Sequence, residues 1–248
     1  MKIFTSVFLL ILMNVFVFGQ KQIITVYLAG DSTMAQKTAD KRPETGWGEY
    51  LQSQFDDSRV KIENHAQNGR STKSFIAEGR WQAIVDRLKK GDYVFIEFGH
   101  NDEKLDKPGT GAAANGEYRE NLIRFVRDVR AKNAFPVLLT PVMRRRFDEN
   151  GKFFDTHGEY PDAVRKVAAE LKVPLIDMHR ESEAFIKNLG AEDSKKLFLI
   201  LKEGEHPNYP KGIEDNTHFS SFGAQQMAKI AAAEIQKQKI KLRKYLKK

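Results

Sequence analysis

The stretch Ile23-Ile24-Thr25-Val26-Tyr27-Leu28-Ala29-Gly30-Asp31-Ser32-Thr33-Met34 decides how the rest of the chain is interpreted. Its first six residues are aliphatic, aromatic or β-branched, which is typical of a short buried strand. Gly30 ends this run, and the three residues after it favour turns and helix N-caps. The pattern places Ser32 at the carboxyl end of a central strand, where open parallel sheets build their active crevices. On its own, Gly-Asp-Ser is more often an ordinary turn than a catalytic motif.

Strand-like and helix-like patterns alternate from this stretch to the end of the chain. Further strands are predicted over residues 60–64, 93–98, 136–140 and 173–177. Helices are predicted over residues 81–88, 118–129, 160–171 and 221–238, with two shorter ones between 181 and 200. Loops are predicted over residues 104–116, lying over the site, and 203–216. This alternation indicates a single α/β domain, a three-layer α/β/α sandwich around a parallel sheet of about five strands.

The N-terminus has the pattern of a secretory signal peptide. Met1-Lys2 precedes an apolar run from Ile3 to Phe18, and the short residues that follow predict cleavage near Gly19 or Gln20. A retained membrane anchor is the alternative, but it needs about 20 apolar residues and this run is shorter. We therefore expect a secreted or periplasmic protein whose mature form has no membrane span. The predicted organisation is a signal peptide over 1–20, one domain over 21–236 and a basic tail over 237–248.

Composition excludes several kinds of site. The chain contains no cysteine, which excludes disulfides, thiolate metal ligands and a cysteine nucleophile. The formal charge of +8 comes from Lys2 and the seven cations between 237 and 248, because the rest of the chain has equal numbers of basic and acidic residues. We interpret residues 237–248 as a solvated helix end, where cations favour the helix dipole. Nucleic acid is not an expected partner, since no recognition motif accompanies these cations.

Four loops of the predicted fold carry polar residues that can form one site. All strand C-termini of a parallel sheet face the same edge, so Ser32, Gly69, Asn101 and His218 can converge there. Serine needs a base to take its proton, and His218 can serve. Asp215 lies three residues earlier and can reach the other ring nitrogen of His218. The backbone N–H groups of Ser32 and Gly69 and the Asn101 amide fit the role of oxyanion donors.

In this set of motifs the chain resembles the SGNH (GDSL-type) hydrolases, and within them the rhamnogalacturonan acetylesterase-like carbohydrate esterases. The motifs that carry the resemblance occur in the family's order across nearly the whole predicted domain. They are Gly30-Asp31-Ser32-Thr33-Met34-Ala35, Asn68-Gly69-Arg70-Ser71, Phe98-Gly99-His100-Asn101-Asp102, Thr140-Pro141-Val142 and Asp215-Asn216-Thr217-His218-Phe219. The resemblance implies a flavodoxin-like sheet, a Ser-His-Asp mechanism and no cofactor. It also implies removal of O-acetyl groups from an acidic pectic polysaccharide, with rhamnogalacturonan as the expected polymer.

Other functions stay open beside this one. Acetylxylan esterase and lipid ester hydrolase activities occur in the same superfamily, and a carbohydrate-binding relative without catalysis is the non-enzymatic alternative. Neither the acetylated sugar position nor the oligomeric state follows from the sequence, and a monomer is the simpler expectation. No metal site is expected, because the histidines have no ligand-like spacing.

Three further residues are candidates for substrate binding. Arg70 follows Gly69, and Arg144 begins an Arg-Arg-Arg run after the fourth predicted strand; a guanidinium matches a carboxylate in geometry. Which arginine of 144–146 faces the substrate stays open. His100 is the third candidate, although bracing of the loop at 101 is the favoured reading. Asp102 is expected either to contact the surroundings of Ser32 or to cap a helix.

Overall fold

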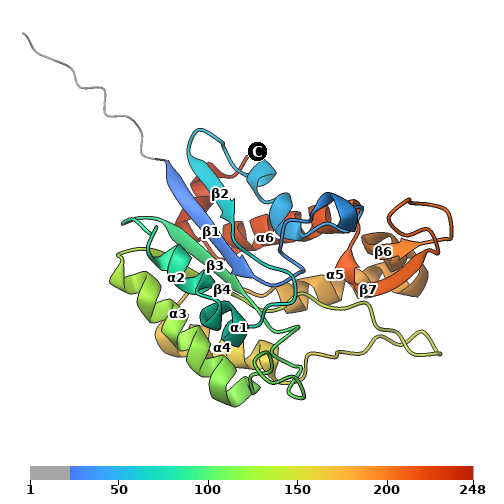
Figure 1. Ribbon diagram of the computed structural model, residues 1–248. Helices are drawn as coiled ribbons and strands as arrows, with labels where there is room; N and C mark the ends of the chain where they lie inside the picture. Colours follow the sequence, from blue (N-terminus) through green and yellow to red (C-terminus); the bar gives the residue numbers. More distant parts are fainter. Residues whose placement is uncertain (1–22, 248) are drawn as a thin grey trace, which may run out of the picture.

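The central sheet accounts for the positions of three catalytic candidates, Ser32, Gly69 and Asn101, which follow its strands. The computed structural model describes residues 23–247, and its five main strands are all parallel in the order β2-β1-β3-β4-β5 (Figure 1). These strands are β1 (Ile24–Gly30), β2 (Val60–Asn64), β3 (Tyr93–Glu97), β4 (Phe135–Leu139) and β5 (Leu175–Ile176). The strand order is the flavodoxin-like one. The predicted fold class is therefore confirmed.

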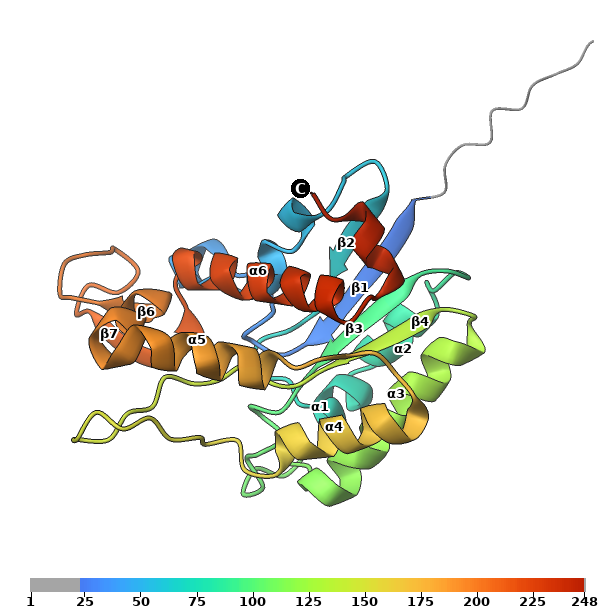
Figure 2. The ribbon, with the colours of Figure 1, turned by 180° about the vertical axis from the view of Figure 1, so that it is seen from behind.

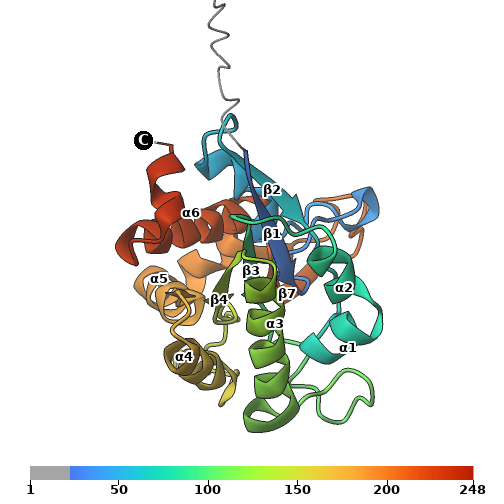
Figure 3. The same cartoon turned by 90° about the vertical axis from the view of Figure 1, so that its left-hand side faces the viewer.

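Helices cover both faces of the sheet (Figures 2 and 3). One face carries α1 (Thr72–Ala77), α2 (Arg80–Val85), α3 (Arg119–Ala131) and α4 (Tyr160–Leu171). The other carries α5 (Met178–Asp193) and α6 (Ser221–Lys237). Side chains alternate along β1, so that Val26 and Leu28 join the core under α5 and α6 while Tyr27 and Ala29 join the core under α1 to α4. The sheet is thus buried on both faces, as its apolar strands predict.

Short helical turns complete the chain. They are η1 (Ala39–Lys41), η2 (Trp47–Glu49), η3 (Gln52–Gln54), η4 (Ala114–Tyr118), η5 (Ser194–Leu197) and η6 (Lys241–Tyr245). Two tryptophans, Trp47 in η2 and Trp81 in α2, are both almost completely buried. Their indole N–H groups donate to Glu97 and Asp128 at 2.7 and 2.8 Å. Both are core residues and not platforms for a sugar.

A β-hairpin replaces part of the helix and loop that we predicted between 181 and 216. Strands β6 (Phe198–Leu201) and β7 (Ile213–Phe219) pair antiparallel in a separate two-stranded sheet. Residues 198–201 are Phe-Leu-Ile-Leu, an apolar run too short for a helix, and pairing with β7 satisfies its backbone. The prediction of two short helices reaching 200 was wrong. Asp215 and His218 consequently lie on a strand and not in a loop.

The basic segment 237–247 also differs from its prediction, because it packs against the domain instead of extending into solvent. Ile240 is 5% exposed and Leu242 is fully buried in the core under α5 and α6. The backbone N–H of Lys247 donates to the carbonyl of Gln54 at 2.8 Å. Apolar residues interspersed among the cations are the physical reason, since they provide a buried side to a segment whose charges stay in water. The domain therefore extends past 236.

We expect Leu242→Ala to lower the free energy of unfolding by about 2–5 kcal/mol, the cost of removing a buried leucine side chain and leaving a cavity. Urea denaturation followed by circular dichroism measures this loss. Leu105→Ala is the matched control, since Leu105 is 64% exposed and should change stability little. Equal stability of the two variants would mean that residues 240–247 contribute nothing to the fold.

The N-terminal signal peptide predicted over 1–20 lies outside the described residues. Within 23–247, none of the helices has the length and apolar composition to cross a bilayer.

Candidate active site

The turn after β1 positions Ser32. A Cβ on Gly30 would lie 2.8 Å from the carbonyl oxygen of Glu97, so only glycine permits the close approach of β1 and β3 at this point. The Asp31 carboxylate accepts hydrogen bonds from the backbone N–H and the hydroxyl of Thr33, at 2.9 and 2.8 Å. Asp31 thereby holds the turn in the manner of an Asx-turn. The Ser32 side chain is left at the carboxyl end of β1, at the floor of a cavity.

Ser32, His218 and Asp215 lie in one hydrogen-bonded chain. Ser32 Oγ is 2.8 Å from Nε2 of His218, and Nδ1 of the same ring is 2.7 Å from Oδ2 of Asp215. The other carboxylate oxygen of Asp215 accepts the backbone N–H groups of Thr217 and His218, at 2.8 and 3.0 Å. The carboxylate is thus held from two sides. The geometry is that of a nucleophile, a base and a group that orients the base.

An irregularity in the β6–β7 ladder makes this contact possible. Residues three apart on a regular strand point to opposite faces and lie about 10 Å apart, because each residue adds about 3.3 Å. Here Phe198 pairs with Phe219 and the next residue, Leu199, pairs with Asp215, so residues 216–218 bulge out of the ladder. Arg145 holds the bulge: its backbone N–H donates to the Asn216 carbonyl at 2.8 Å and its guanidinium to the Asn216 side chain at 2.7 Å. The bulge turns Asp215 and His218 toward one another.

The environment of Asp215 keeps it ionised. Partial burial would raise the pKa of Asp215, but the hydrogen bond and charge of His218 and the N–H groups of residues 217 and 218 lower it to about 2. The carboxylate is therefore negative at any pH at which the protein is expected to work. A negative partner stabilises the imidazolium that forms when His218 accepts a proton.

Three donors surround the space beside Ser32 Oγ. Neither the Ser32 nor the Gly69 backbone N–H donates to another group within residues 23–247. Gly69 has a φ of +76°, which favours glycine, and a Cβ there would meet no atom within 4 Å. Asn101 is oriented by its neighbours, because its Oδ1 accepts from Lys104 at 2.7 Å and its Nδ2 donates to the Arg70 carbonyl at 3.1 Å. The second N–H of that amide remains for a ligand.

All these groups line one cavity of about 490 Å³. Most of its lining residues are polar, and Leu199 and Ile213 are the aliphatic members. Three cations and two acids also line it: Lys41, Lys104, Arg144, Glu44 and Asp215. Lys104 belongs to the loop that we predicted to lie over the site. The polar walls suit a hydrated substrate and differ from the apolar pocket that a long acyl chain needs.

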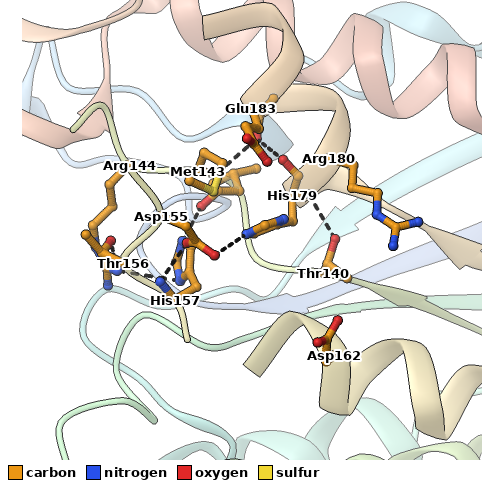
Figure 4. Close-up of polar contacts among 12 residues, drawn as sticks. Thr140, Met143, Arg144, Asp155, Thr156, His157, Asp162, His179, Arg180 and Glu183 are labelled. Carbon is orange, nitrogen blue, oxygen red and sulfur yellow. Dashed lines mark hydrogen bonds and ion pairs between the residues drawn. The ribbon is translucent and has the colours of Figure 1, made fainter. Parts of the chain in front are cut away.

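Arg144 and Arg145, in the arginine run 144–146, have different positions and roles. Arg144 lines the cavity, and its guanidinium lies 2.8 Å from Glu103. It also lies 3.0 Å from the Thr156 hydroxyl (Figure 4). Arg145 is buried and holds the bulge at Asn216, as described above. Of the three arginines, Arg144 is the one at the cavity wall, and it is braced by an ion pair with Glu103.

The other two substrate-binding candidates, Arg70 and His100, are placed differently from Arg144. The Arg70 guanidinium is 3.1 Å from Glu78 and 2.8 Å from the Asn68 carbonyl, and its residue does not line the cavity. The Glu78 carboxylate holds it away, so a direct role in substrate binding is not supported. His100 lines the cavity but is 4% exposed, with Nδ1 3.2 Å from the Asp31 carboxylate. It is placed to brace the Ser32 turn.

A histidine–carboxylate network continues behind the cavity wall. The His157 ring packs edge-on against His100; its Nε2 donates to the Val142 carbonyl at 2.8 Å, and its Nδ1 contacts a carboxylate oxygen of Glu103. Behind it Asp155 accepts the His157 backbone N–H at 2.8 Å and lies 3.1 Å from His179 Nε2 (Figure 4). The network ties the segment around 155–157 to α5. Asp102 also has a structural position, since it accepts from the backbone N–H and hydroxyl of Thr72 and so caps α1.

Lys37 is a residue of the site that the sequence analysis missed. Its side chain is fully buried, and its ammonium group donates to the Ser32 carbonyl and to Asn68 Oδ1 at 2.8 Å, and lies 2.7 Å from Glu44. Burial lowers the pKa of Lys37, although the hydrogen bond and charge of Glu44 oppose this. The ammonium therefore joins the two loops that supply the N–H groups of residues 32 and 69. No sequence pattern reveals it, because a lysine in a polar turn is ordinarily at the surface.

Two buried acids under the Ser32 turn, Glu97 and Asp31, have pKa values that are shifted in opposite directions. Burial and the negative charge of Asp31 raise the pKa of Glu97 to about 8, although donors from residues 47, 142 and 33 oppose the shift. Burial would also raise the pKa of Asp31, but His100 and the Thr33 donors lower it below its usual range. At neutral pH Glu97 is protonated and Asp31 carries the charge. Only one negative charge then lies beneath the nucleophile.

Within residues 23–247 no three histidines or carboxylates gather in an arrangement that could hold a metal ion.

The chain is similar to known ester hydrolases along most of its length. Residues 28–225 match the model of the GDSL-like Lipase/Acylhydrolase family. Rhamnogalacturonan acetylesterase RhgT of Bacillus subtilis (strain 168) is 44% identical over 226 residues, which are 91% of this chain and 95% of that protein. Rhamnogalacturonan acetylesterase of Emericella nidulans is 31% identical over 223 residues, covering 82% of this chain and 81% of the relative. The crystal structure of protein YXIM from Bacillus subtilis superposes with a TM-score of 0.75 at 26% identity, over 89% of this chain and 58% of that one.

Proposed function

Because the chain belongs to the GDSL-like lipase/acylhydrolase family and is a carboxylic ester hydrolase, we propose that it removes O-acetyl groups from rhamnogalacturonan outside the cytoplasm. The observation that carries the mechanism is the hydrogen-bonded chain of Ser32, His218 and Asp215 at 2.8 and 2.7 Å. The polymer is proposed from the 44% identical relative RhgT, which is named for that activity. The apolar run of residues 3–18 supports export.

The reaction proceeds through an acetyl-enzyme. Ser32 Oγ attacks the acetyl carbonyl carbon while His218 Nε2 takes the hydroxyl proton. The carbonyl oxygen becomes an oxyanion and accepts hydrogen bonds from the N–H groups of Ser32 and Gly69 and from the Asn101 amide. His218 then donates its proton to the sugar oxygen as the bond between that oxygen and the acetyl carbon breaks, which releases the sugar hydroxyl and leaves the acetyl group on Ser32. Water, deprotonated by the same His218, releases acetate and restores the serine.

Substrate selection is proposed to reside in the charged cavity wall. Lys41, Lys104 and Arg144 line it, and uronate carboxylates of a pectic backbone are complementary to them. Lysine and arginine positions at the wall favour an acidic polymer over neutral xylan, and the scarcity of apolar wall residues disfavours a lipid.

The proposed substrate is tested by measuring acetate release from acetylated rhamnogalacturonan, acetylated xylan and a long-chain 4-nitrophenyl ester under one set of conditions. We expect the highest kcat/KM with rhamnogalacturonan, and a selective decrease for that polymer at high salt because ions screen the cavity cations. 4-Nitrophenyl acetate is the control, since this small neutral ester should be insensitive to salt. Faster release from xylan, or preference for the long-chain ester, would contradict the proposal.

We expect Asn101→Ala to lower kcat roughly 10²–10³-fold, the loss typical of one oxyanion donor. KM should change little, because the oxyanion forms only on the way to product. Steady-state kinetics with 4-nitrophenyl acetate measure both constants. Asn150→Ala, in an exposed loop, is the control and should leave both unchanged. A rise in KM at constant kcat would identify Asn101 as a ground-state binding residue.

Lys37 acts as a positioning residue in this proposal, through the loops it joins. Lys37→Met should lower kcat about 10–100-fold at constant KM, because hydrogen bonds to a charged group contribute about 1.5–3 kcal/mol and each 1.4 kcal/mol is a factor of ten. Kinetics on protein verified as folded by circular dichroism measure this change. The double variant Lys37→Met/Glu44→Gln removes the unpaired carboxylate and should retain the kcat loss.

The control for Lys37 is Lys73→Met, which removes an exposed lysine paired with Glu117. It should not alter kcat. If Lys37→Met lowers only the free energy of unfolding and the folded enzyme keeps its full kcat, the buried ammonium is structural and has no part in positioning the donors.

A further inference from the structure

The edge of the sheet opposite the active site carries two adjoining hollows lined by cations, here called the basic hollows. Ile24, Tyr93 and Phe135 begin strands β1, β3 and β4, and each lines at least one hollow. The larger hollow, of about 590 Å³, is lined by five cations: Lys90, Arg130, Lys172, Lys239 and Lys241. The smaller, of about 420 Å³, shares Lys90 and Lys241 and adds Arg59 and Lys244.

These cations have almost no acidic counterpart. Asp92 is the one acid that lines either hollow; it is 4% exposed, and its carboxylate accepts the backbone N–H groups of Thr25 and Lys89 at 3.1 and 2.9 Å. Across residues 23–247, none of the five lysines at the hollows lies within 4.0 Å of a carboxylate. Three of the seven cations between 237 and 248, namely Lys239, Lys241 and Lys244, line the hollows.

The floor of the larger hollow is apolar. Phe135 is 43% exposed and lies there with Pro136 and Pro174. Lys241 Nζ is 5.8 Å from the centre of the Phe135 ring, so the folded-back C-terminal segment sets one cation directly above this floor. A concave apolar floor with cations at its rim matches a ligand that has a flat apolar face and negative groups at its edge.

We propose that the basic hollows are a second, non-catalytic binding site for an acidic polysaccharide, which they hold through the carboxylates of its uronate residues. A pyranose ring presents an apolar C–H face to the floor and its carboxylate to the rim lysines. A membrane surface fits less well, because the lysines line a concavity and do not project from a flat face. Nucleic acid fits less well, because Phe135 is the one strongly exposed aromatic ring of the larger hollow, whereas single-stranded nucleic acid stacks successive bases on several rings. The choice of a saccharide rests on the proposed function, whereas the anion site rests on the hollows themselves.

The position of the hollows defines what they can do. Five residues of β3, at about 3.3 Å each, separate them from the cavity, so one short saccharide cannot fill both sites. A polymer held here stays at a high effective concentration near the cavity. The site should therefore increase retention on long acidic polymers and leave hydrolysis of a small ester unchanged.

The test is binding of polygalacturonate, which has no acetyl ester, by isothermal titration calorimetry at low salt. In a Ser32→Ala background, Lys90→Glu/Lys241→Glu alters the two cations shared by both hollows. Lys152→Glu/Lys166→Glu is the matched control, because both lysines are exposed and neither lines a hollow. We expect the first pair to weaken binding at least about 10-fold, through loss and reversal of charge-assisted contacts, and the control to leave it unchanged. Both pairs should keep full activity on 4-nitrophenyl acetate when Ser32 is present.

The proposal would be overturned if the two double variants bound polygalacturonate equally well, or if both lost the same amount of affinity. Equal affinity for polyglutamate of matched charge would show a general polyanion effect and overturn the saccharide. Tighter binding to phosphatidylglycerol vesicles or to single-stranded DNA would overturn it in favour of those partners. None of these readouts depends on acetate release, so a failure of the proposed deacetylation would be seen separately.

Discussion

Replacing Ser32 with alanine is expected to abolish ester hydrolysis, with kcat falling by more than roughly three orders of magnitude because the acetyl-enzyme can no longer form. The fold should persist, since the hydroxyl is bonded to His218 alone and the turn is held by Asp31 and Thr33. Acetate release from acetylated rhamnogalacturonan and hydrolysis of 4-nitrophenyl acetate should fall together. Circular dichroism and urea denaturation should match the parent protein.

Ser58→Ala is the control, because Ser58 is an exposed serine in a turn and does not line the cavity. It should keep full activity. A serine-directed phosphonate gives an independent measurement: mass spectrometry of the labelled protein should find the adduct on Ser32. Residual turnover above about one part in a thousand, in protein free of other esterases, would mean that another residue is the nucleophile.

Replacing His218 with alanine should be as damaging as losing Ser32, because members of a triad act as a unit. His206 lies in the connection between β6 and β7, and His206→Ala is the control that should retain activity. Asp215→Asn is expected to be milder, since the amide keeps the position of the group but loses its charge. If His218→Ala retains most of its kcat, the base must be sought elsewhere among the cavity residues.

The pH profile tests the same assignment. Activity should rise as the pH is raised from about 5 to 8, because a base that accepts the serine proton must be neutral. Asp215 should add no second transition there, since its pKa is lowered to about 2 and it is ionised throughout. A flat kcat profile with chemistry rate-limiting would contradict the role of His218 as base.

Much of the architecture could be predicted from local patterns. The strand ending at Gly30 and the strand Val60–Asn64 are read from apolar runs and alternation, and α4 follows from 3.6-residue periodicity. The parallel arrangement then brings residues 32, 69 and 101 to one edge without further information. Local sequence patterns are therefore enough to predict the position of a residue that directly follows a regular strand.

The remaining features depend on contacts between distant parts of the chain. The bulge at 216–218 exists because β7 pairs with β6 and is held by Arg145, and neither partner is marked in the sequence. Lys37 is buried only because Glu44 and Asn68 fold over it. Arg70 looks available in sequence, yet Glu78 eight residues later takes its guanidinium. In each case a polar residue has found a partner, and the choice of partner is a property of the fold.

The folding-back of the C-terminal segment has a practical consequence for handling the protein. Tyr245 and Leu242 lie in the same hollow as Ile24, so both ends of the described chain reach the surface on the edge remote from Ser32. An affinity tag, a cellulose-binding module or a bead linker joined at either end would leave the mouth of the cavity unobstructed. Immobilised on a solid support through its ends, the protein would present that mouth outward to the surrounding solution.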